Sequence, residues 1–265
     1  MEQNVLFAFG LSLLAGLATG VGSLIAFVAK RTHGVLLSVG LGFSGGVMIY
    51  VSFMELYPSG LEIVQGFYPG SKGELWGIAA FFGGMVIFAL IDRLLPESLN
   101  PHEAHRVEEM GESDNHHRLQ RMGIFTALAV GIHNFPEGMA TFVGALQDPE
   151  IGMAIAAAVA LHNIPEGIAV AVPIFFATGS RLKAFKYSFL SGLAEPLGAL
   201  VGYFLLRPWL DGVGLGFIFA AVAGIMVAIS LDELIPAARE YGEPHKAMYG
   251  MAAGMAVMAV GLVFL

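Results

Sequence analysis

Two copies of one polar motif decide the fold of this chain: VGIHNFPEGMA at residues 130–140 and VALHNIPEGIA at residues 159–169. Seven of their eleven positions are identical. Each copy lies within a long apolar stretch, so its His, Asn and Glu are expected inside a membrane-spanning helix. A charged side chain at the centre of such a helix costs about 2.5 to 3.5 kcal/mol. The motif therefore indicates a functional polar site rather than a simple lipid anchor.

The composition around the motifs is that of a membrane protein with several spans. Of the 265 residues, 56% are apolar, 13% are charged and 35 are Gly, whereas soluble chains have about 25% charged residues and about 7% Gly. The net charge of -8 argues against a nucleic-acid partner. Because the chain has no Cys, it has no disulfide and no thiolate metal ligand.

Eight apolar segments are long enough to cross a membrane, which takes about 20 residues. We therefore expect an all-α, polytopic membrane protein of eight transmembrane helices, with residues 1–265 forming a single membrane domain. The first segment has no cationic start and no convincing cleavage site, so it is interpreted as a span and not as a secretion signal. The expected spans are 5–28, 35–56, 75–94, 122–146, 151–179, 187–206, 212–236 and 247–265.

Lysine and arginine are distributed unevenly between the two sides of this topology. Eleven of the 13 fall in loops on one side, and only Lys72 and Arg207 fall on the other. The positive-inside rule places the first set of loops in the cytoplasm and both termini outside it. Residues 96–120 are expected to form a mobile cytoplasmic loop. Its four histidines could capture metal, but a solvated loop is the favoured interpretation.

The motif copies and a second, weaker repeat indicate inverted internal symmetry. The weaker repeat aligns residues 46–58 with residues 224–236. In the eight-span topology both repeated pairs run in opposite directions, so that spans 1–3 correspond to spans 6–8, and span 4 corresponds to span 5. Inverted repeats are typical of secondary transporters, whose sites lie near the membrane midplane. A channel could share this pattern.

The polar residues of spans four to six are candidate metal ligands. His133 shares a helix face with Glu137 at i+4, and the second copy repeats this pair. The two motif histidines each lie about 18 Å along the helix from opposite surfaces, close to the midplane. No Lys or Arg lies in the apolar part of any span, so a divalent cation is the expected counter-charge. The candidate ligands are His133, Asn134, Glu137, His162, Asn163, Glu166 and Glu195.

This donor set also narrows the choice of metal. Imidazoles and carboxylates without thiolate suit Zn(II), Fe(II), Mn(II) or Co(II) better than Cu(I) or Mg(II). There are enough donors for one or two ions, with Glu137 and Glu166 able to bridge them. Binding should weaken as pH falls, because protons compete for the same side chains. Glu55, Asp232 and Glu233 are candidate ends of an ion pathway, or else carboxylates that simply reach interfacial water.

The doubled His-Asn-x-Pro-Glu-Gly motif, with Ser191-Gly-Leu-Ala-Glu195-Pro196 on the next span, resembles the ZIP (Zrt/Irt-like) metal transporters. The resemblance is closest to their bacterial ZupT-like branch. It implies import of Zn(II), and of Fe, Mn, Co or Cd, across the bacterial inner membrane. It also implies a binuclear site built from the seven ligands, no enzyme cofactor, and a homodimer. Finally, it implies that spans one, four, five and six slide against the other four.

Two alternatives to a carrier stay open at this stage. One is an intramembrane metal-dependent hydrolase, because a bound metal can activate water. The chain has no HExxH motif, however, and every candidate ligand is already assigned without leaving a separate base. The other alternative is a passive metal channel, which a saturation experiment separates from a carrier.

Overall fold

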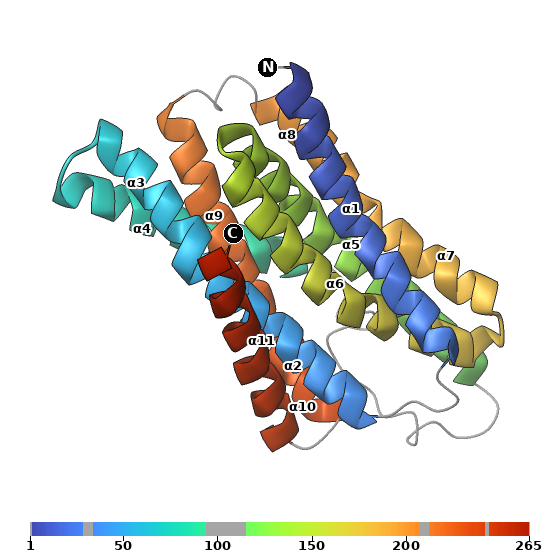
Figure 1. Cartoon of the computed structure of the whole chain (residues 1–265). Coiled ribbons are helices and arrows are strands. Elements are labelled where there is room, and N and C mark those ends of the chain that lie inside the picture. The colour runs from blue at the N-terminus through green and yellow to red at the C-terminus, as the bar shows by residue number, and fades with distance from the viewer. Residues whose placement is uncertain (1, 29–33, 94–114, 207–211, 242–243, 265) are drawn as a thin grey trace.

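The computed structural model describes residues 2–28, 34–93, 115–206, 212–241 and 244–264, and these ranges contain helices and no strand (Figure 1). The expected all-α fold is confirmed for this part of the chain. The first helices are α1 (Glu2–Val28), α2 (Gly34–Val51), the π-helix η1 (Ser52–Leu56), α3 (Tyr57–Phe67) and α4 (Ser71–Arg93). After the gap come α5 (Asn115–Gln147), α6 (Pro149–Thr178), α7 (Arg181–Gly192), α8 (Ala194–Leu206), α9 (Val213–Ile229), the π-helix η5 (Ser230–Leu234), α10 (Ile235–Tyr241) and α11 (Pro244–Phe264).

Capping residues explain where the two motif-bearing helices, α5 and α6, end and begin. Asp148 alone separates them, and its side chain accepts a hydrogen bond from the Glu150 backbone N at 2.8 Å. Pro149 occupies the first turn of α6, where its missing N–H costs nothing. Gly179, with φ of 63°, ends α6 in the left-handed region. The two copies of the motif therefore lie on consecutive helices that pack against each other.

The second repeat takes the same local form in both of its copies. Ser52 and Ser230 each begin a five-residue π-helix. The Ser52 hydroxyl donates to the Met48 carbonyl at 2.7 Å, and the Ser230 hydroxyl donates to the Met226 carbonyl at 2.8 Å. Single π-turns inside longer helices are rare and often occur at functional sites. Both π-turns continue into further helix, so α2 to α3 and α9 to α10 are two long, uninterrupted rods.

Six helical segments in the described residues are long and apolar enough to cross a membrane. The chain is therefore a multi-pass membrane protein. The remaining two expected spans, 122–146 and 187–206, correspond to α5 and to α7 with α8, which are not among the six. α7 and α8 are only 12 and 13 residues long. The six segments are Asn4–Leu24, Leu37–Phe67, Ser71–Arg93, Pro149–Val172, Val213–Arg239 and Pro244–Val263.

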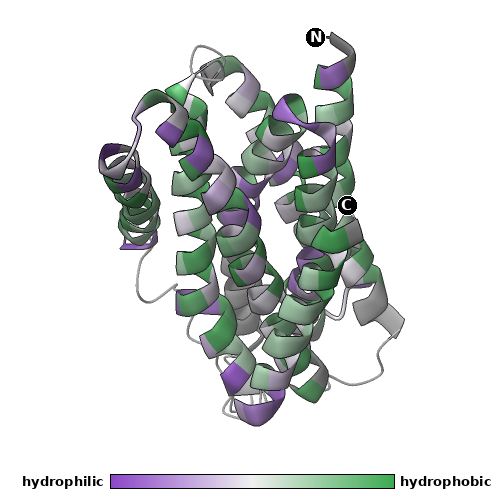
Figure 2. Cartoon of the chain, turned by 60° about the vertical axis from the view of Figure 1, so that its left-hand side comes forward, coloured by the Kyte–Doolittle hydropathy of each residue, from purple (hydrophilic) through white to green (hydrophobic). Residues whose placement is uncertain are grey.

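The helices form two groups that meet at the centre of the molecule. α5 and α6 pack together with α1, α7 and α8, while α2 packs with α9, α10 and α11, and α3 and α4 pack on α9 (Figure 1). The groups touch mainly where α2 crosses α6. Figure 2 shows hydrophobic ribbon over most of the helices, with hydrophilic positions at their ends and inside the bundle.

Glycine allows a close contact between α2 and α11 in the second group. On α2, a Cβ at Gly42 or Gly46 would collide with the backbone of α11, and a Cβ at Gly250 or Gly254 of α11 would collide with the backbone of α2. Such spacing lets two helix backbones touch in a membrane, where packing rather than the hydrophobic effect holds helices together. α2 and α11 therefore form one tight pair.

The expected loop at 96–120 begins outside the described residues. Residues 96–114 are not described, and with them His102 and His105. Residues 115–120, which are predicted to belong to the loop, are instead the first residues of α5. That part of the prediction is wrong, because a helix can extend beyond the hydrocarbon into water, where polar residues do not stop it.

Candidate metal site

The seven predicted ligands occupy the interiors of α5 and α6 and the first turn of α8. All seven side chains are buried despite being polar or ionisable. The largest exposed fraction is 6%, for His133, and the others are at 2% or less. The set comprises His133, Asn134 and Glu137 on α5, His162, Asn163 and Glu166 on α6, and Glu195 on α8.

One ion-pair contact joins the two copies of the motif. His162 Nε2 on α6 lies 3.3 Å from Glu137 Oε2 on α5, and both side chains are at most 1% exposed. The motif thus pairs the histidine of one copy with the carboxylate of the other. This arrangement arises because both residues lie at the middle of their helices, and α5 and α6 run side by side.

The side-chain nitrogens of the two asparagines donate hydrogen bonds to neighbouring helices, and their side-chain oxygens accept none. Asn134 Nδ2 donates to the Ser191 carbonyl of α7 at 3.3 Å. Asn163 Nδ2 donates to the Ala15 carbonyl of α1 at 2.9 Å, and also to Glu195 Oε1 of α8. An amide has two donor hydrogens and one acceptor oxygen. The side-chain oxygens of both asparagines therefore remain available to bind a further group.

Glu233 of η5 belongs to the same buried cluster. Its Oε1 lies 2.9 Å from His133 Nε2, and both side chains are 7% exposed. The ring of Phe88 on α4 also packs against His133, with ring centroids 5.9 Å apart. The site therefore draws residues from both groups of helices, at the point where the groups meet.

Most of the unsatisfied polar atoms in this cluster are acceptor oxygens. Glu137 Oε1, Glu166 Oε2, Glu195 Oε2 and the Oδ1 atoms of both asparagines are buried and receive no hydrogen bond. Buried polar groups in native proteins are nearly always paired, since leaving one unpaired costs about 1 to 3 kcal/mol, and more when the group is charged. No Lys or Arg occurs between Arg121 and Arg181 in the sequence. A bound cation would supply the positive charge that these buried oxygens lack.

The ligands are brought together as pairs and not as an assembled coordination sphere. Within the described residues, no three His, Asp or Glu side chains are arranged to hold one ion. The two histidines instead turn toward Glu233 and Glu137. Binding of one ion by three of these side chains therefore requires rotations that exchange the pairs for metal bonds.

Comparison with known proteins places the chain in a family. A family model described as ZIP Zinc transporter matches residues 97–261. The chain belongs to the ZIP family. It is 61% identical to the zinc transporter ZupT of Lysinibacillus sphaericus, with both chains covered completely, and 57% identical to that of Streptococcus mutans, with 99% of each covered. Its identity to the zinc transporter ZupT of Oceanobacillus iheyensis is 58%, again over 99% of each chain. ZIP proteins are transporters and not enzymes, which sets aside the hydrolase alternative.

In this ZIP chain, the glycine of each motif copy controls how near the ligands come to one another. A Cβ at Gly138 would collide with the backbone of Glu195, and a Cβ at Gly167 would collide with the backbone of Thr19 on α1. Glycine at these positions lets α8 and α1 approach the motif helices. Because Gly138 has no side chain, the start of α8, with the Glu195 carboxylate, can pack directly against α5.

The three expected pathway ends of the ZIP chain differ in their surroundings. Glu55 in η1 is half-buried, and Asp232 in η5 is exposed. Asp232 and Phe88 line one cavity of about 480 Å³ between α4 and the α9–η5 rod. Glu233 differs from both, because it is buried and contacts His133 within the cluster. Nothing in the sequence signals this contact or the role of Phe88, which is an apolar residue.

Proposed function

We propose that this chain imports divalent metal ions, with Zn(II) as the main substrate, into the cytoplasm through the buried cluster on α5, α6 and α8. The observation that carries the proposal is the set of carboxylate oxygens on Glu137, Glu166 and Glu195 that are buried and accept no hydrogen bond. A divalent ion neutralises these carboxylates while it is bound, and the site carries no permanent positive side chain that would repel the next ion. The relatives named zinc transporter support the same substrate.

The donor chemistry extends the proposal to other metals and to a second ion. Two imidazoles, two amides and three carboxylates offer donors to Zn(II), Fe(II), Mn(II), Co(II) and Cd(II). Glu137 and Glu166 occupy the same place in the two motif copies, on helices that pack together. We propose that they bridge a binuclear site whose remaining ligands are His133, Asn134, His162, Asn163 and Glu195.

The proposed architecture is a single membrane domain of eight spans, residues 1–265, with inverted repeats. α5 serves as the fourth span, and α7 with α8 serves as the sixth. The matching π-turns at Ser52 and Ser230 support the pairing of spans 1–3 with spans 6–8. The adjacent motif helices α5 and α6 support the pairing of span 4 with span 5. We further propose a homodimer in the bacterial inner membrane, with both termini outside the cytoplasm, on the basis of the lysine and arginine distribution and the family resemblance.

The two groups of helices support a moving-carrier mechanism. α1, α5, α6, α7 and α8 correspond to the spans expected to slide, and the other helices correspond to the scaffold. The Ser44 hydroxyl of α2 donates to the His162 carbonyl of α6 at 2.8 Å, and the His133–Glu233 pair also crosses between the groups. These contacts would have to break and reform as one group slides along the other.

Asp232 and Glu233 suggest where the ion leaves the site. Glu233 contacts His133, and the adjacent Asp232 lines the same cavity as Phe88, whose ring packs on His133. We propose that an ion released from His133 passes to these two carboxylates on its way to the cytoplasm. Glu55 in η1 has the corresponding role at the outer end, where its half-buried carboxylate attracts incoming cations.

Uptake by reconstituted protein tests the proposal. Liposomes that contain the purified chain and a zinc-sensitive dye are expected to take up Zn(II) at a rate that saturates with concentration. Glu137→Ala and Glu166→Ala should each reduce uptake to that of empty liposomes, because each removes a carboxylate from the site. His245→Ala, at an exposed position on α11, is the matched control and should keep the original rate.

Two outcomes would contradict the proposal. Folded protein that gives no more entry of Zn(II), Fe(II), Mn(II), Co(II) or Cd(II) than empty liposomes would exclude metal import, and folding is checked by gel filtration and thermal unfolding. Uptake that rises linearly with metal concentration, with the shallow temperature dependence of diffusion, would instead identify a passive channel. Saturating uptake together with loss in both glutamate variants would support the carrier and its site.

A further inference from the structure

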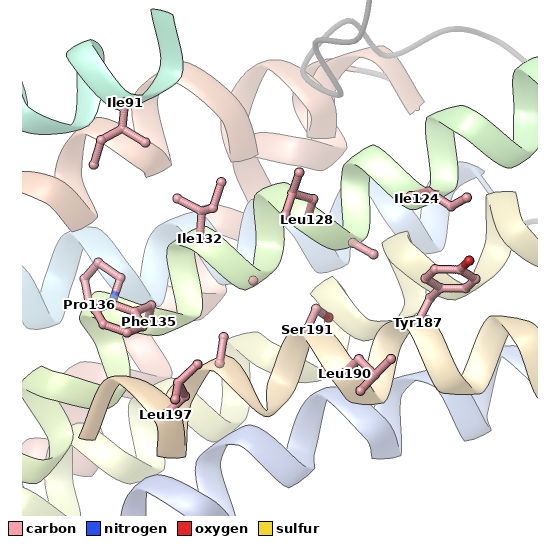
Figure 3. Close-up of a pocket in the computed structure, with 13 residues that line it drawn as sticks. Ile91, Ile124, Leu128, Ile132, Phe135, Pro136, Tyr187, Leu190, Ser191 and Leu197 are labelled. Atoms are coloured by element: carbon pink, nitrogen blue, oxygen red, sulfur yellow. The ribbon is translucent and has the colours of Figure 1, made fainter. Parts of the chain in front are cut away.

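A long apolar groove lies on the side of the bundle where α5 faces α7 and α8 (Figure 3). Its volume is about 620 Å³. Ile124 and Tyr187 mark one end, and Phe135, Pro136 and Leu197 mark the other, with Ile91 of α4 above them. The groove is separate from the cavity that Asp232 lines, and none of the seven proposed ligands lines it.

The dimensions and chemistry of the groove match a hydrocarbon chain. From Ile124 to Pro136 the groove follows twelve residues of α5, which is about 18 Å at 1.5 Å per residue. One leaflet of a membrane contributes about 15 Å of hydrocarbon. Only Ser191 and Tyr187 bring side-chain oxygens to the groove, and the Ser191 hydroxyl already donates to the Ser188 carbonyl at 2.8 Å. The walls therefore favour an acyl chain over a polar solute.

Basic side chains lie just beyond the Tyr187 end of the groove. Lys183 is one helical turn before Tyr187 on the same face of α7, and Lys186 is the residue directly before Tyr187. Both lysines are exposed, and α7 contains no acidic residue. Long side chains on a helix point back toward its N-terminus, which directs these ammonium groups away from the hydrocarbon and toward the head groups. Clusters of basic residues beside membrane helices attract anionic lipids.

We propose that this groove binds one acyl chain of an anionic phospholipid whose phosphate is held by Lys183 and Lys186. The lysines at the water end select an anionic head group, and the apolar walls within the membrane select an acyl chain. Only the two features together specify an anionic phospholipid. The lipid would lie against Ser191, whose carbonyl accepts the hydrogen bond of Asn134. It therefore fills the space between two helices that carry residues of the metal site. Lipid binding in this groove does not depend on the proposed transport of metal.

Photolabelling in nanodiscs tests the proposal. The probe is a phosphatidylglycerol with a diazirine near the end of one acyl chain, in a phosphatidylcholine bilayer. Labelling is expected at the deep end of the groove, on Phe135, Pro136 and Leu197. Unlabelled phosphatidylglycerol should compete much better than phosphatidylcholine, while inorganic phosphate should not compete.

Two variants separate the charge from the groove. Lys183→Ala with Lys186→Ala should weaken the competition by phosphatidylglycerol about fivefold for each lysine removed. Lys72→Ala removes the same charge from the other end of α4, about 28 Å along the helix from Ile91, and should change nothing. Gly131→Leu should block labelling with both lysines present. A Cβ at Gly131 meets only ordinary contacts, 3.8 Å from Ser191 Cα and 4.0 Å from Ala194 Cβ, so the longer side chain can extend into the groove.

Three results would overturn the proposal. The first is labelling spread evenly over the outward faces of α4 and α11, which would mean that the groove is ordinary lipid-facing surface. The second is equal competition by phosphatidylcholine, or an equal response of the lysine pair and Lys72→Ala, which would remove the charge selection. The third is competition by inorganic phosphate, which would indicate an ion site without an acyl chain. Gel filtration of each variant confirms that the compared proteins are folded.

Discussion

The two π-helices η1 and η5 have similar sequences and the same serine hydrogen bond, yet their glutamates have different surroundings. Glu233 in η5 is 6% exposed and lies 2.9 Å from His133, whereas Glu55 in η1 is half-buried. The neighbours explain the difference. η5 lies against the polar middle of α5, while Phe53 of η1 packs on the ring of Phe81, with centroids 5.7 Å apart. Local sequence sets the turn, and the helix packed against it decides whether the glutamate joins the site.

Removal of each glutamate tests this comparison most severely. Glu233→Ala removes the carboxylate that lies 2.9 Å from His133 and that is proposed to receive the departing ion. We expect zinc uptake by Glu233→Ala to fall by about tenfold or more, which corresponds to a loss of about 1.4 kcal/mol in the interaction with the ion. Glu55→Ala should stay within about twofold, because a half-exposed carboxylate keeps much of its hydration. Both rates come from the liposome assay, with the amount of folded protein equalised.

Glu233→Gln sharpens the same test, because it keeps the shape and removes the charge. If Glu233→Gln and Glu55→Gln reduce uptake equally, the contact with His133 has no special role and the comparison fails.

The aromatic neighbours of the two π-helices provide the second test. Phe88 packs on His133 near η5, and Phe81 packs on Phe53 and Tyr57 at η1. Both rings are buried, so truncation to Ala should lower the free energy of unfolding by about 3 to 5 kcal/mol in each case. Only Phe88→Ala should also weaken zinc affinity, by about tenfold, because it removes the apolar wall beside a proposed ligand. Calorimetric zinc titration and thermal unfolding measure the two effects separately. A similar loss of zinc affinity in Phe81→Ala would show that the affinity falls with the overall stability of the protein and not because of the contact between Phe88 and His133.

The serines that begin the π-turns give the smallest and most symmetric effect. Each hydroxyl is fully buried and donates to a methionine carbonyl four residues earlier. Ser52→Ala and Ser230→Ala should each cost about 0.5 to 1.5 kcal/mol in the free energy of unfolding, the usual net value of one hydrogen bond. Equal costs in chemical denaturation would support equivalent turns. If only one variant is destabilised, the π-turn of the other is stabilised by packing against its neighbours and not by its serine hydrogen bond.

The central part of the candidate site could be predicted from sequence because its signal is local. A His and a Glu four residues apart in an apolar helix, repeated 29 residues later, already imply two polar faces at similar depth. The short link at Asp148 then places the two helices side by side. This arrangement predicts that the polar residues of the two copies lie close together. It does not predict which histidine contacts which glutamate.

Glu233 could not be placed from sequence, because a π-turn rotates every later side chain relative to a regular helix. A regular α-helix over 212–236 puts Glu233 near the end of a span, while the structure puts it against His133. Phe88 had no signal either, since its role depends only on the residue it touches. The number of spans is a similar case. α5 and α7 with α8 carry polar residues or a break at Leu193, which hydropathy alone does not distinguish from a shorter, non-spanning helix.

The amide of Asn163 has a consequence for the protein when it carries no cargo. Its nitrogen donates at once to the Ala15 carbonyl of α1 and to Glu195 of α8, so one side chain joins three helices. An aspartate in its place would have the same shape but no hydrogen to donate, and the three helices would then converge on oxygens that repel one another unless a cation lay between them. With asparagine, this junction needs no ion, so in the proposed carrier cycle the unloaded protein would keep its shape on the return half.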